Sequence, residues 1–68
     1  MKNKRRYWLI MLRDNAGLTQ TALCELIGID RANYCKIESG KRDPRPEVAL
    51  KIAQALNFNM EKFYIDSF

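Results

Sequence analysis

The stretch TQTALCELIGIDRANYCKIESG, residues 19–40, decides the fold. Apolar residues in its first half recur at helical spacing, and Gly28 interrupts that pattern. Glycine adopts positive φ at no steric cost, so Gly28 is expected to begin a tight turn that Asp30 ends by capping the next helix. The stretch therefore predicts two short helices joined by a three-residue turn, the first capped by Thr19 and the second spanning residues 31–39.

Both helices have an apolar face that is expected to pack into the core. In the second helix Tyr34 and Ile37 point inward, and the Tyr34 hydroxyl is expected at the edge of the core, within reach of a phosphate. The outward surface of this helix fits the major groove of DNA, where base edges can be distinguished. That surface carries Arg31, Ala32, Asn33 and Lys36. In the first helix the inward residues are Leu23, Leu26 and Ile27.

Helical patterns continue on both sides of this unit. A helix is expected over residues 4–15, because Trp8, Leu9 and Leu12 recur at helical spacing. A second is expected over residues 46–56, begun by Pro46 and ended by Asn57, and a short third over residues 60–64. The inward face of the second consists of Val48, Ala49, Ile52, Ala53 and Leu56. The fold class is therefore all-α, a compact five-helix domain that spans residues 1–68.

Composition limits what so short a chain can do. Its 68 residues are 47% hydrophobic, which suits one small domain with little room for a substrate cavity. Histidine is absent, which removes the commonest general base and metal ligand. The spacing of Cys24 and Cys35 fits neither a zinc motif nor a disulfide framework, so both are expected to be reduced thiols. No enzyme, metal, cofactor, small-molecule ligand or membrane span is expected, and the location is expected to be cytoplasmic.

Charge is distributed unevenly along the chain. The net charge is +4, but residues 1–13 carry +5, residues 14–30 carry −3, residues 31–46 carry +3 and residues 47–68 carry −1. Two basic blocks separated by an acidic one indicate a polarised molecule that faces a polyanion. The first block includes Lys2, Lys4, Arg5 and Arg6, which are interpreted as a frayed basic end.

Four motifs, together with their spacing, resemble the Cro/C1-type (XRE) helix-turn-helix domain of phage repressors and related bacterial regulators. They are LRDNAGLTQ at 12–20, GID at 28–30, KIESGKRDP at 36–44 and VALKIAQAL at 48–56. The resemblance covers residues 7–64 and implies a lambda-repressor-like DNA-binding domain with a helix-turn-helix core at 19–39. The tyrosine–tryptophan pair at residues 7–8, which follows a run of basic residues, is similar to the start of short family members from phages and mobile elements.

The resemblance also implies which residues contact DNA. Gln20 matches a position that contacts phosphate and often a base edge. Arg31, Ala32 and Lys36 match base-reading positions, and the neighbouring Asn33 is expected to reach phosphate or base. The loop residues Lys41, Arg42 and Arg45 match positions that touch the DNA backbone and sometimes the minor groove. By the same resemblance, Arg13 and Glu38 match a structural ion pair that links the first helix to the end of the third.

The function expected from these features is sequence-specific binding of double-stranded DNA by a transcriptional regulator, a repressor that acts as a homodimer on its operator. A protein-interaction module that retains the fold, such as an antitoxin or an anti-repressor, is the alternative. The apolar tail is expected to complete the core with Phe58, Met60 and Phe63, and to place Tyr64 or Phe68 at a dimer contact.

Overall fold

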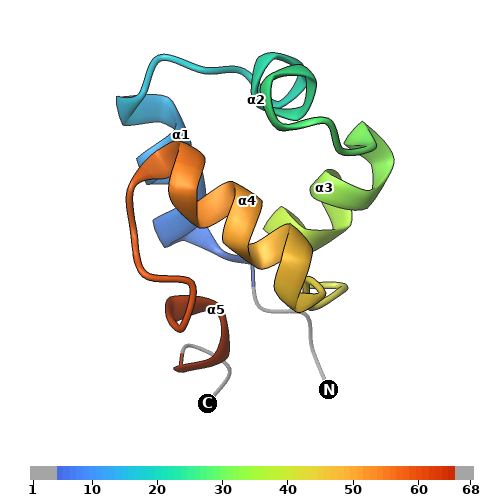
Figure 1. Ribbon diagram of the computed structural model, residues 1–68, viewed down its shortest axis with the longest axis vertical. Coiled ribbons are helices and arrows are strands. Elements are labelled where there is room, and N and C mark those ends of the chain that lie inside the picture. Colours follow the sequence, from blue (N-terminus) through green and yellow to red (C-terminus); the bar gives the residue numbers. More distant parts are fainter. Residues whose placement is uncertain (1–4, 66–68) are drawn as a thin grey trace.

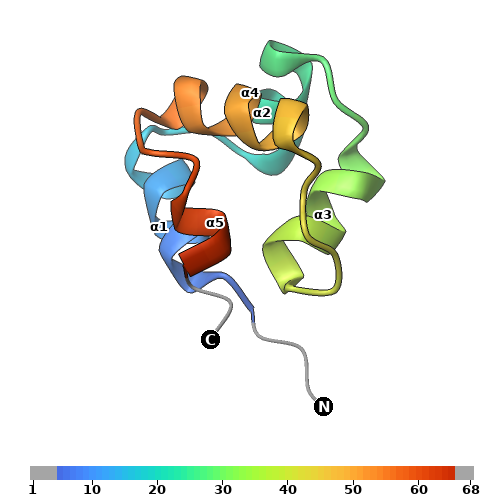
Figure 2. The ribbon, with the colours of Figure 1, turned by 60° about the horizontal axis from the view of Figure 1, so that its bottom comes forward.

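The computed structural model describes residues 5–65, which form five helices and no strand. The helices are α1 (Tyr7–Asn15), α2 (Gln20–Ile27), α3 (Arg31–Ser39), α4 (Pro46–Leu56) and α5 (Lys62–Ile65). Helix α2 packs against α3 and α4, α4 crosses the middle of the molecule, and α5 lies beside α1 (Figure 1, Figure 2). This arrangement confirms the expected all-α, five-helix fold.

The ends of α2 and the start of α3 follow signals in the sequence. The hydroxyl oxygen of Thr19 accepts a hydrogen bond from the N–H of Ala22 at 3.0 Å. A carboxylate oxygen of Asp30 accepts one from the N–H of Asn33 at 3.1 Å. Between these caps, Gly28 has a φ of 74°, in the left-handed region that favours glycine. The capped helices and tight turn are as predicted.

The C-terminal helices also begin and end close to the predicted residues. Pro46 is the first residue of α4, and Asn57 ends it with a φ of 61°. Asn59 accepts a hydrogen bond from the N–H of Glu61 at 2.9 Å, as a capping residue should, but α5 begins only at Lys62. The sequence therefore placed the start of this helix two residues too early.

Helix α1 begins at Tyr7, later than the sequence pattern predicted. Arg6 precedes it with a non-helical backbone, at φ −85° and ψ 77°. The N–H of Arg6 instead donates to the carbonyl oxygen of Glu38 at 2.9 Å. A long-range contact therefore sets where this helix starts, and residue 4 lies outside the described residues.

Every helix contributes to one buried core. The predicted inward residues Tyr34 and Ile37 are fully buried, and α5 adds Phe63. The rings of Phe58 and Phe63 pack edge-on against Trp8, with centroids 5.2 and 5.3 Å away, respectively. The remaining buried apolar residues are Leu9, Leu23, Cys24, Ala49, Ile52, Ala53 and Leu56, while Val48 and Met60 are half-buried. The predicted inward face of α4 is confirmed, and so is the prediction that Phe58, Met60 and Phe63 complete the core.

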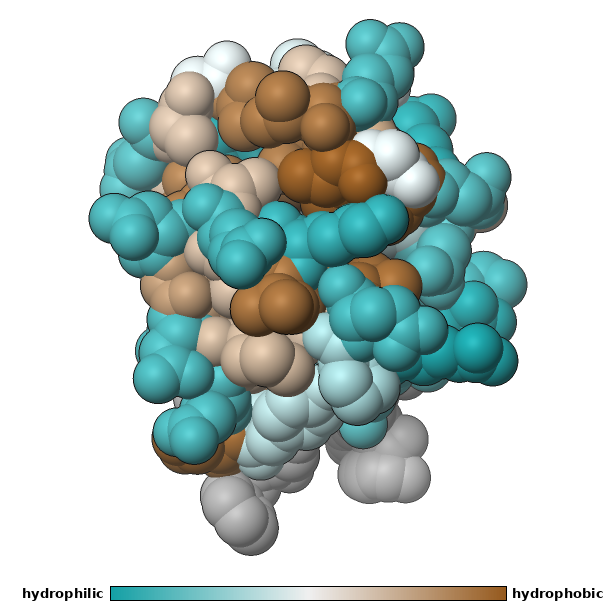
Figure 3. All heavy atoms as spheres, viewed as in Figure 1, coloured by the Kyte–Doolittle hydropathy of each residue, from teal (hydrophilic) through white to brown (hydrophobic). Residues whose placement is uncertain are grey.

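The predicted inward position of Leu26 is wrong, because its side chain is 65% exposed. The buried side of α2 carries Leu23 and Cys24, with Ile27 half-buried beside them. At about 100° per residue, Leu26 lies roughly a quarter-turn or more away from the middle of that stripe. Its side chain belongs to an apolar surface over α2 and α4 (Figure 3), where Leu26, Ile27 and Ala55 line a shallow groove together with Lys51 and Gln54.

Candidate nucleic-acid interface

Helix α3 presents its predicted outward residues on the surface. Arg31, Ala32 and Lys36 are exposed, and Asn33 is half-buried. Tyr34 and Ile37 anchor the opposite side of the helix in the core. The outward side therefore offers hydrogen-bond donors and a methyl group on a helix that its own inward residues hold in place.

A buried carboxylate fastens the C-terminal end of α3 to α1 and α2. Glu38 is only 2% exposed, and the Nε of Arg13 donates to its Oε2 at 2.7 Å. The hydroxyl of Tyr34 donates to the same oxygen at 2.8 Å, and the Nε2 of Gln20 donates to Oε1 at 2.7 Å. The predicted ion pair of Arg13 and Glu38 is confirmed, and it is the centre of a larger network, here called the Glu38 network: Arg13, Gln20, Tyr34 and Glu38.

The Glu38 network changes the interpretation of two residues. The hydroxyl of Tyr34 was expected at the edge of the core, but it is buried and donates to Glu38. Tyr34 and Glu38 are one helical turn apart, so the Tyr34 hydroxyl meets the carboxylate inside the protein. Gln20 is half-buried and also accepts a hydrogen bond from the Sγ of Cys35 at 3.1 Å. Its side chain thus supports α3 in the structure, and its contact with DNA stays a prediction.

The Glu38 network also changes the pKa values of Glu38 and Tyr34. Burial acts to raise the pKa of Glu38, but hydrogen bonds from Arg13, Gln20 and Tyr34 outweigh it, so the pKa lies below its usual value. Burial, followed by the hydrogen bond to Glu38, raises the pKa of the Tyr34 hydroxyl, which therefore remains a proton donor. Glu38 is consequently a charged acceptor surrounded by donors at neutral pH.

The loop after α3, residues 41–45 and here called the basic loop, is hydrogen-bonded to α3. The N–H groups of Lys41 and Arg42 both donate to the carbonyl oxygen of Lys36, at 2.9 and 3.2 Å. The guanidinium of Arg42 donates to the side-chain oxygen of Asn33 at 2.7 Å. These bonds hold the basic loop against α3, and the exposed Arg45 ends it just before α4.

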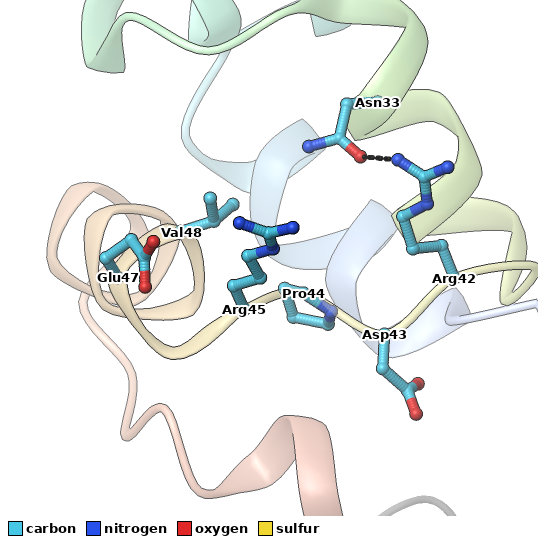
Figure 4. Close-up of a pocket in the computed structure, with 7 residues that line it drawn as sticks. All are labelled: Asn33, Arg42, Asp43, Pro44, Arg45, Glu47 and Val48. Atoms are coloured by element: carbon cyan, nitrogen blue, oxygen red, sulfur yellow. Dashed lines mark hydrogen bonds between the residues drawn. The ribbon is translucent and has the colours of Figure 1, made fainter.

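A pocket of about 460 Å³ lies between α3 and the start of α4 (Figure 4). It brings together three of the predicted DNA-contacting residues, Asn33, Arg42 and Arg45. The other residues that line it are Asp43, Pro44, Glu47 and Val48. The guanidinium groups of Arg42 and Arg45 both extend toward Asn33, so the pocket concentrates hydrogen-bond donors beside the exposed side of α3.

Arg6 contradicts the interpretation of the N-terminal basic residues as a frayed end. Its side chain is 9% exposed and donates to the carbonyl oxygens of Ile37 and Arg42 and to Oδ1 of Asp43. Its guanidinium also lies over the ring of Phe63, 5.5 Å from the centroid. Arg6 therefore joins the N-terminal segment to the end of α3 and to the basic loop. Arg5 is exposed, and Lys2 and Lys4 lie outside the described residues.

The sequence also led to predictions about the cysteines, metal binding and membrane spans within residues 5–65. Cys24 and Cys35 are free thiols, the first buried and the second half-buried, as predicted. Within this range no cluster of three side chains suited to holding a metal ion occurs. None of the described helices is long and apolar enough to cross a membrane. Tyr64 is 40% exposed and donates to the carbonyl oxygen of Pro44 at 3.3 Å, while Phe68 lies outside the described residues.

Comparison with known proteins places this geometry in a family. A family model described as helix-turn-helix matches residues 9–63. An uncharacterised HTH-type transcriptional regulator of Methanocaldococcus jannaschii is 37% identical over 65 residues, which cover 96% of this chain and 92% of the relative. The uncharacterised HTH-type transcriptional regulator YqaF of Bacillus subtilis is 38% identical over 61 residues, covering 90% of this chain and 80% of the relative.

An uncharacterised HTH-type transcriptional regulator of Archaeoglobus fulgidus is 34% identical over 53 residues, which cover 78% of this chain and 76% of the relative. No solved structure matches the chain. The family model covers most of the chain, and the first two relatives align with nearly all of it. The chain therefore belongs to the Cro/C1-type helix-turn-helix family of DNA-binding transcription regulators.

Proposed function

We propose that this protein represses transcription by binding an operator in double-stranded DNA, with α3 in the major groove. The observation that carries the proposal is the exposed side of α3, which the Glu38 network and the inward residues Tyr34 and Ile37 hold in a fixed position. Arg31 is the candidate for a bidentate contact with guanine, and the methyl group of Ala32 for a contact with thymine. Gln20, Asn33 and Lys36 complete the proposed reading surface.

The basic loop supplies the proposed contacts with phosphate. Lys41, Arg42 and Arg45 are exposed, and backbone hydrogen bonds to Lys36 keep the loop beside α3. Phosphate contacts fix the register of a protein on the duplex, and base contacts then give specificity. The basic loop is therefore proposed to position the protein on the duplex, and α3 to discriminate between bases.

A homodimer on a two-fold operator is part of the proposal. One α3 spans few base pairs, and a second copy bound one helical turn away multiplies the specificity. The partially exposed Tyr64 is the proposed dimer contact within the described residues. The protein is proposed to work in the cytoplasm by binding alone, without catalysis or a cofactor.

The exposed apolar surface over α2 and α4 favours a second candidate function. Leu26 at 65% exposure and its neighbour Ile27 suit contact with another protein, as in an antitoxin or an anti-repressor that retains the fold. The two functions differ in their dependence on salt, because displacement of counterions dominates binding to DNA. That difference makes a direct test possible.

The affinity for duplex DNA is expected to fall steeply as salt rises. Each neutralised phosphate contributes about −0.9 to the slope of log affinity against log salt, so the three loop cations give a slope of about −3 for one protomer and about −5 for the proposed homodimer. The measurement is fluorescence anisotropy with duplexes selected from a random library, from about 50 to 200 mM salt. A flat response, or no duplex binding in dilute salt, would refute the proposal and leave the interaction module.

Substitutions in α3 and in the loop are expected to act differently. Arg31→Ala should relax the preference for one base pair, with a loss of about 1–3 kcal/mol on the preferred sequence. Lys41→Ala should weaken binding to all sequences by a similar factor and make the salt slope shallower by about one for each bound protomer. The measurement is affinity for a series of single-base operator variants. If both variants keep the wild-type preferences, α3 does not read the bases through Arg31.

A further inference from the structure

The side-chain amide of Asn33 has a defined orientation. Its Oδ1 accepts a hydrogen bond from Nη1 of Arg42 at 2.7 Å, and this is the one hydrogen bond drawn among the seven residues around the pocket (Figure 4). Asn33 lies on the first turn of α3, next to the exposed Arg31 and Ala32. The partner of this amide is therefore a loop cation and not a neighbour on its own helix.

Arg42 approaches Asn33 from a backbone that is held on both sides of the residue. The N–H of Arg42 donates to the carbonyl oxygen of Lys36 at 3.2 Å, and its own carbonyl oxygen accepts from Nη1 of Arg6 at 3.2 Å. The Arg6 side chain is itself 9% exposed. The guanidinium thus extends from a fixed position, although the side chain of Arg42 is exposed to solvent.

This contact selects one of the two orientations of the amide. A guanidinium has only donors, and the amide has an accepting oxygen at one side and a donating nitrogen at the other. A flipped Asn33 would turn its NH₂ group toward the N–H groups of Arg42, donor against donor. The amide oxygen therefore stays toward Arg42, and in Figure 4 the nitrogen lies on the opposite side.

The orientation leaves a specific hydrogen-bonding edge available. The nitrogen offers donors, and the oxygen keeps its second lone pair on the side next to the nitrogen, because Arg42 approaches from the other side. A donor beside an acceptor is the pattern that complements N7 and the N6 amino group of adenine in the major groove. Guanine presents two acceptors at that edge, so the amide satisfies only one of them.

We propose that Arg42 is a specificity-determining positioning residue, which orients the amide of Asn33 so that it reads adenine. The inference rests on the proposed function, since it requires α3 to lie in the major groove. It gives Arg42 a role that differs from that of Arg45, which lines the same pocket but has no hydrogen bond to Asn33 in Figure 4. Arg45 contributes only charge toward phosphate, whereas Arg42 also sets which base is preferred.

The test measures base preference and overall affinity separately. Wild type and the variants Asn33→Ala, Arg42→Ala, Arg42→Lys and Arg45→Ala are each titrated against a selected operator and against all four bases at every position of one half-site. Circular dichroism confirms that each variant is folded. Arg42→Lys keeps the charge, but the shorter side chain does not carry its ammonium group as far as the position from which Nη1 of Arg42 contacts Asn33, so it separates orientation from electrostatics. Arg45→Ala is the matched control, because it removes a cation from the same pocket.

Wild type is expected to prefer adenine at one position by about tenfold or more. Asn33→Ala should abolish that preference, and Arg42→Ala should reduce it to about threefold or less. A double variant that combines Asn33→Ala with Arg42→Ala should resemble Asn33→Ala in preference, because the two residues act as a unit. Arg42→Lys should keep most of the overall affinity yet lose the preference, and Arg45→Ala should weaken all sequences while keeping it.

Three results would overturn the inference, and they differ from one another. If Arg42→Ala weakens every sequence alike and the adenine preference survives, Arg42 contacts only phosphate and the proposed function still stands. If Asn33→Ala leaves every preference unchanged, Asn33 is not a reader, while the other residues of α3 remain candidates. If wild type itself binds all duplexes equally, the proposed function fails and the inference fails with it.

Discussion

Glu38→Ala is expected to lower the free energy of unfolding by about 3–5 kcal/mol, because removing one partner of a buried ion pair strands the other. Glu38 is 2% exposed and accepts hydrogen bonds from Arg13, Gln20 and Tyr34. Alanine would leave the Arg13 cation without its carboxylate and the Tyr34 hydroxyl without an acceptor inside the core. The three donors lie on α1, α2 and α3, so the loss of their common acceptor weakens the contacts between these helices.

The expected loss is large for a chain of this size. Stability of about 0.05–0.15 kcal/mol per residue gives roughly 3–10 kcal/mol for 68 residues. A domain this small loses about 4–8 °C of Tm per kcal/mol, so the variant should melt roughly 12–40 °C lower or be unfolded at room temperature. Thermal and urea unfolding followed by circular dichroism measure the loss, and urea gives the free energy directly.

Asp14→Ala is the matched control for this substitution. Its carboxylate lies 3.6 Å from Nη1 of the same Arg13, but the side chain is 67% exposed. An exposed ion pair of this kind contributes about 0–1 kcal/mol, so the control should change Tm by only a few degrees. If Glu38→Ala melts as the control does, the Glu38 network does not stabilise the fold.

The same carboxylate makes stability depend on pH. The folded pKa of Glu38 is lowered, so its contribution is fully present above the ordinary value of 4.5 and is lost as the pH falls through the folded pKa. Wild type should therefore lose Tm more steeply than Glu38→Gln as the pH falls below about 4.5, because the glutamine has no proton to bind there. Equal slopes for the two proteins would show that another group controls the acid transition.

Local signals account for most of the fold that the sequence predicted. Thr19 and Asp30 cap helices through hydrogen bonds to N–H groups only three residues away. Pro46 and Asn57 mark the two ends of α4 through their own backbone preferences. Such signals lie within one helical turn of the residues that they affect, so they can be recognised without knowledge of the tertiary structure.

The polar contacts between helices could not be predicted in the same way. Gln20 begins a helix, where an amide suits solvent, phosphate or another side chain equally well, and its partner Glu38 is 18 residues away. The hydroxyl of Tyr34 donates to Glu38 inside the protein and does not extend to the surface, because the buried carboxylate places an acceptor in the core. The sequence indicated which residues lie near the proposed DNA interface. The packing of the helices determines which of them already form hydrogen bonds within the protein.

Arg6 is the clearest case of a residue that the sequence did not distinguish. It stands beside Arg5 in a run of basic residues, and composition gives both the same interpretation. The acceptors of Arg6 lie 31 to 37 residues further along, and two of them are backbone carbonyl oxygens that carry no sequence signature. One partial signal existed, because Asp43 is the only acid in the basic loop.

Arg6→Ala is expected to cost about 2–3 kcal/mol, the range for losing a buried charge-assisted hydrogen bond together with the partners that it leaves unsatisfied. The carbonyl oxygens of Ile37 and Arg42 lose a donor, and Asp43 loses its salt bridge of 2.6 Å. At about 4–8 °C per kcal/mol, Tm should fall by roughly 8–24 °C. Arg5→Ala removes the same charge from the exposed neighbouring position and should change Tm little.

Arg6→Lys separates the charge of this residue from its geometry. Lysine carries the same charge on a single ammonium group, which does not reproduce the planar fork that reaches three acceptors at once. Its stability should therefore lie closer to that of Arg6→Ala than to wild type. Because Arg6 holds the carbonyl of Arg42, both variants should also weaken DNA binding more than Arg5→Ala does at equal salt. Wild-type melting and wild-type affinity in Arg6→Lys would mean that Arg6 acts through charge alone, and that the basic loop keeps its position without it.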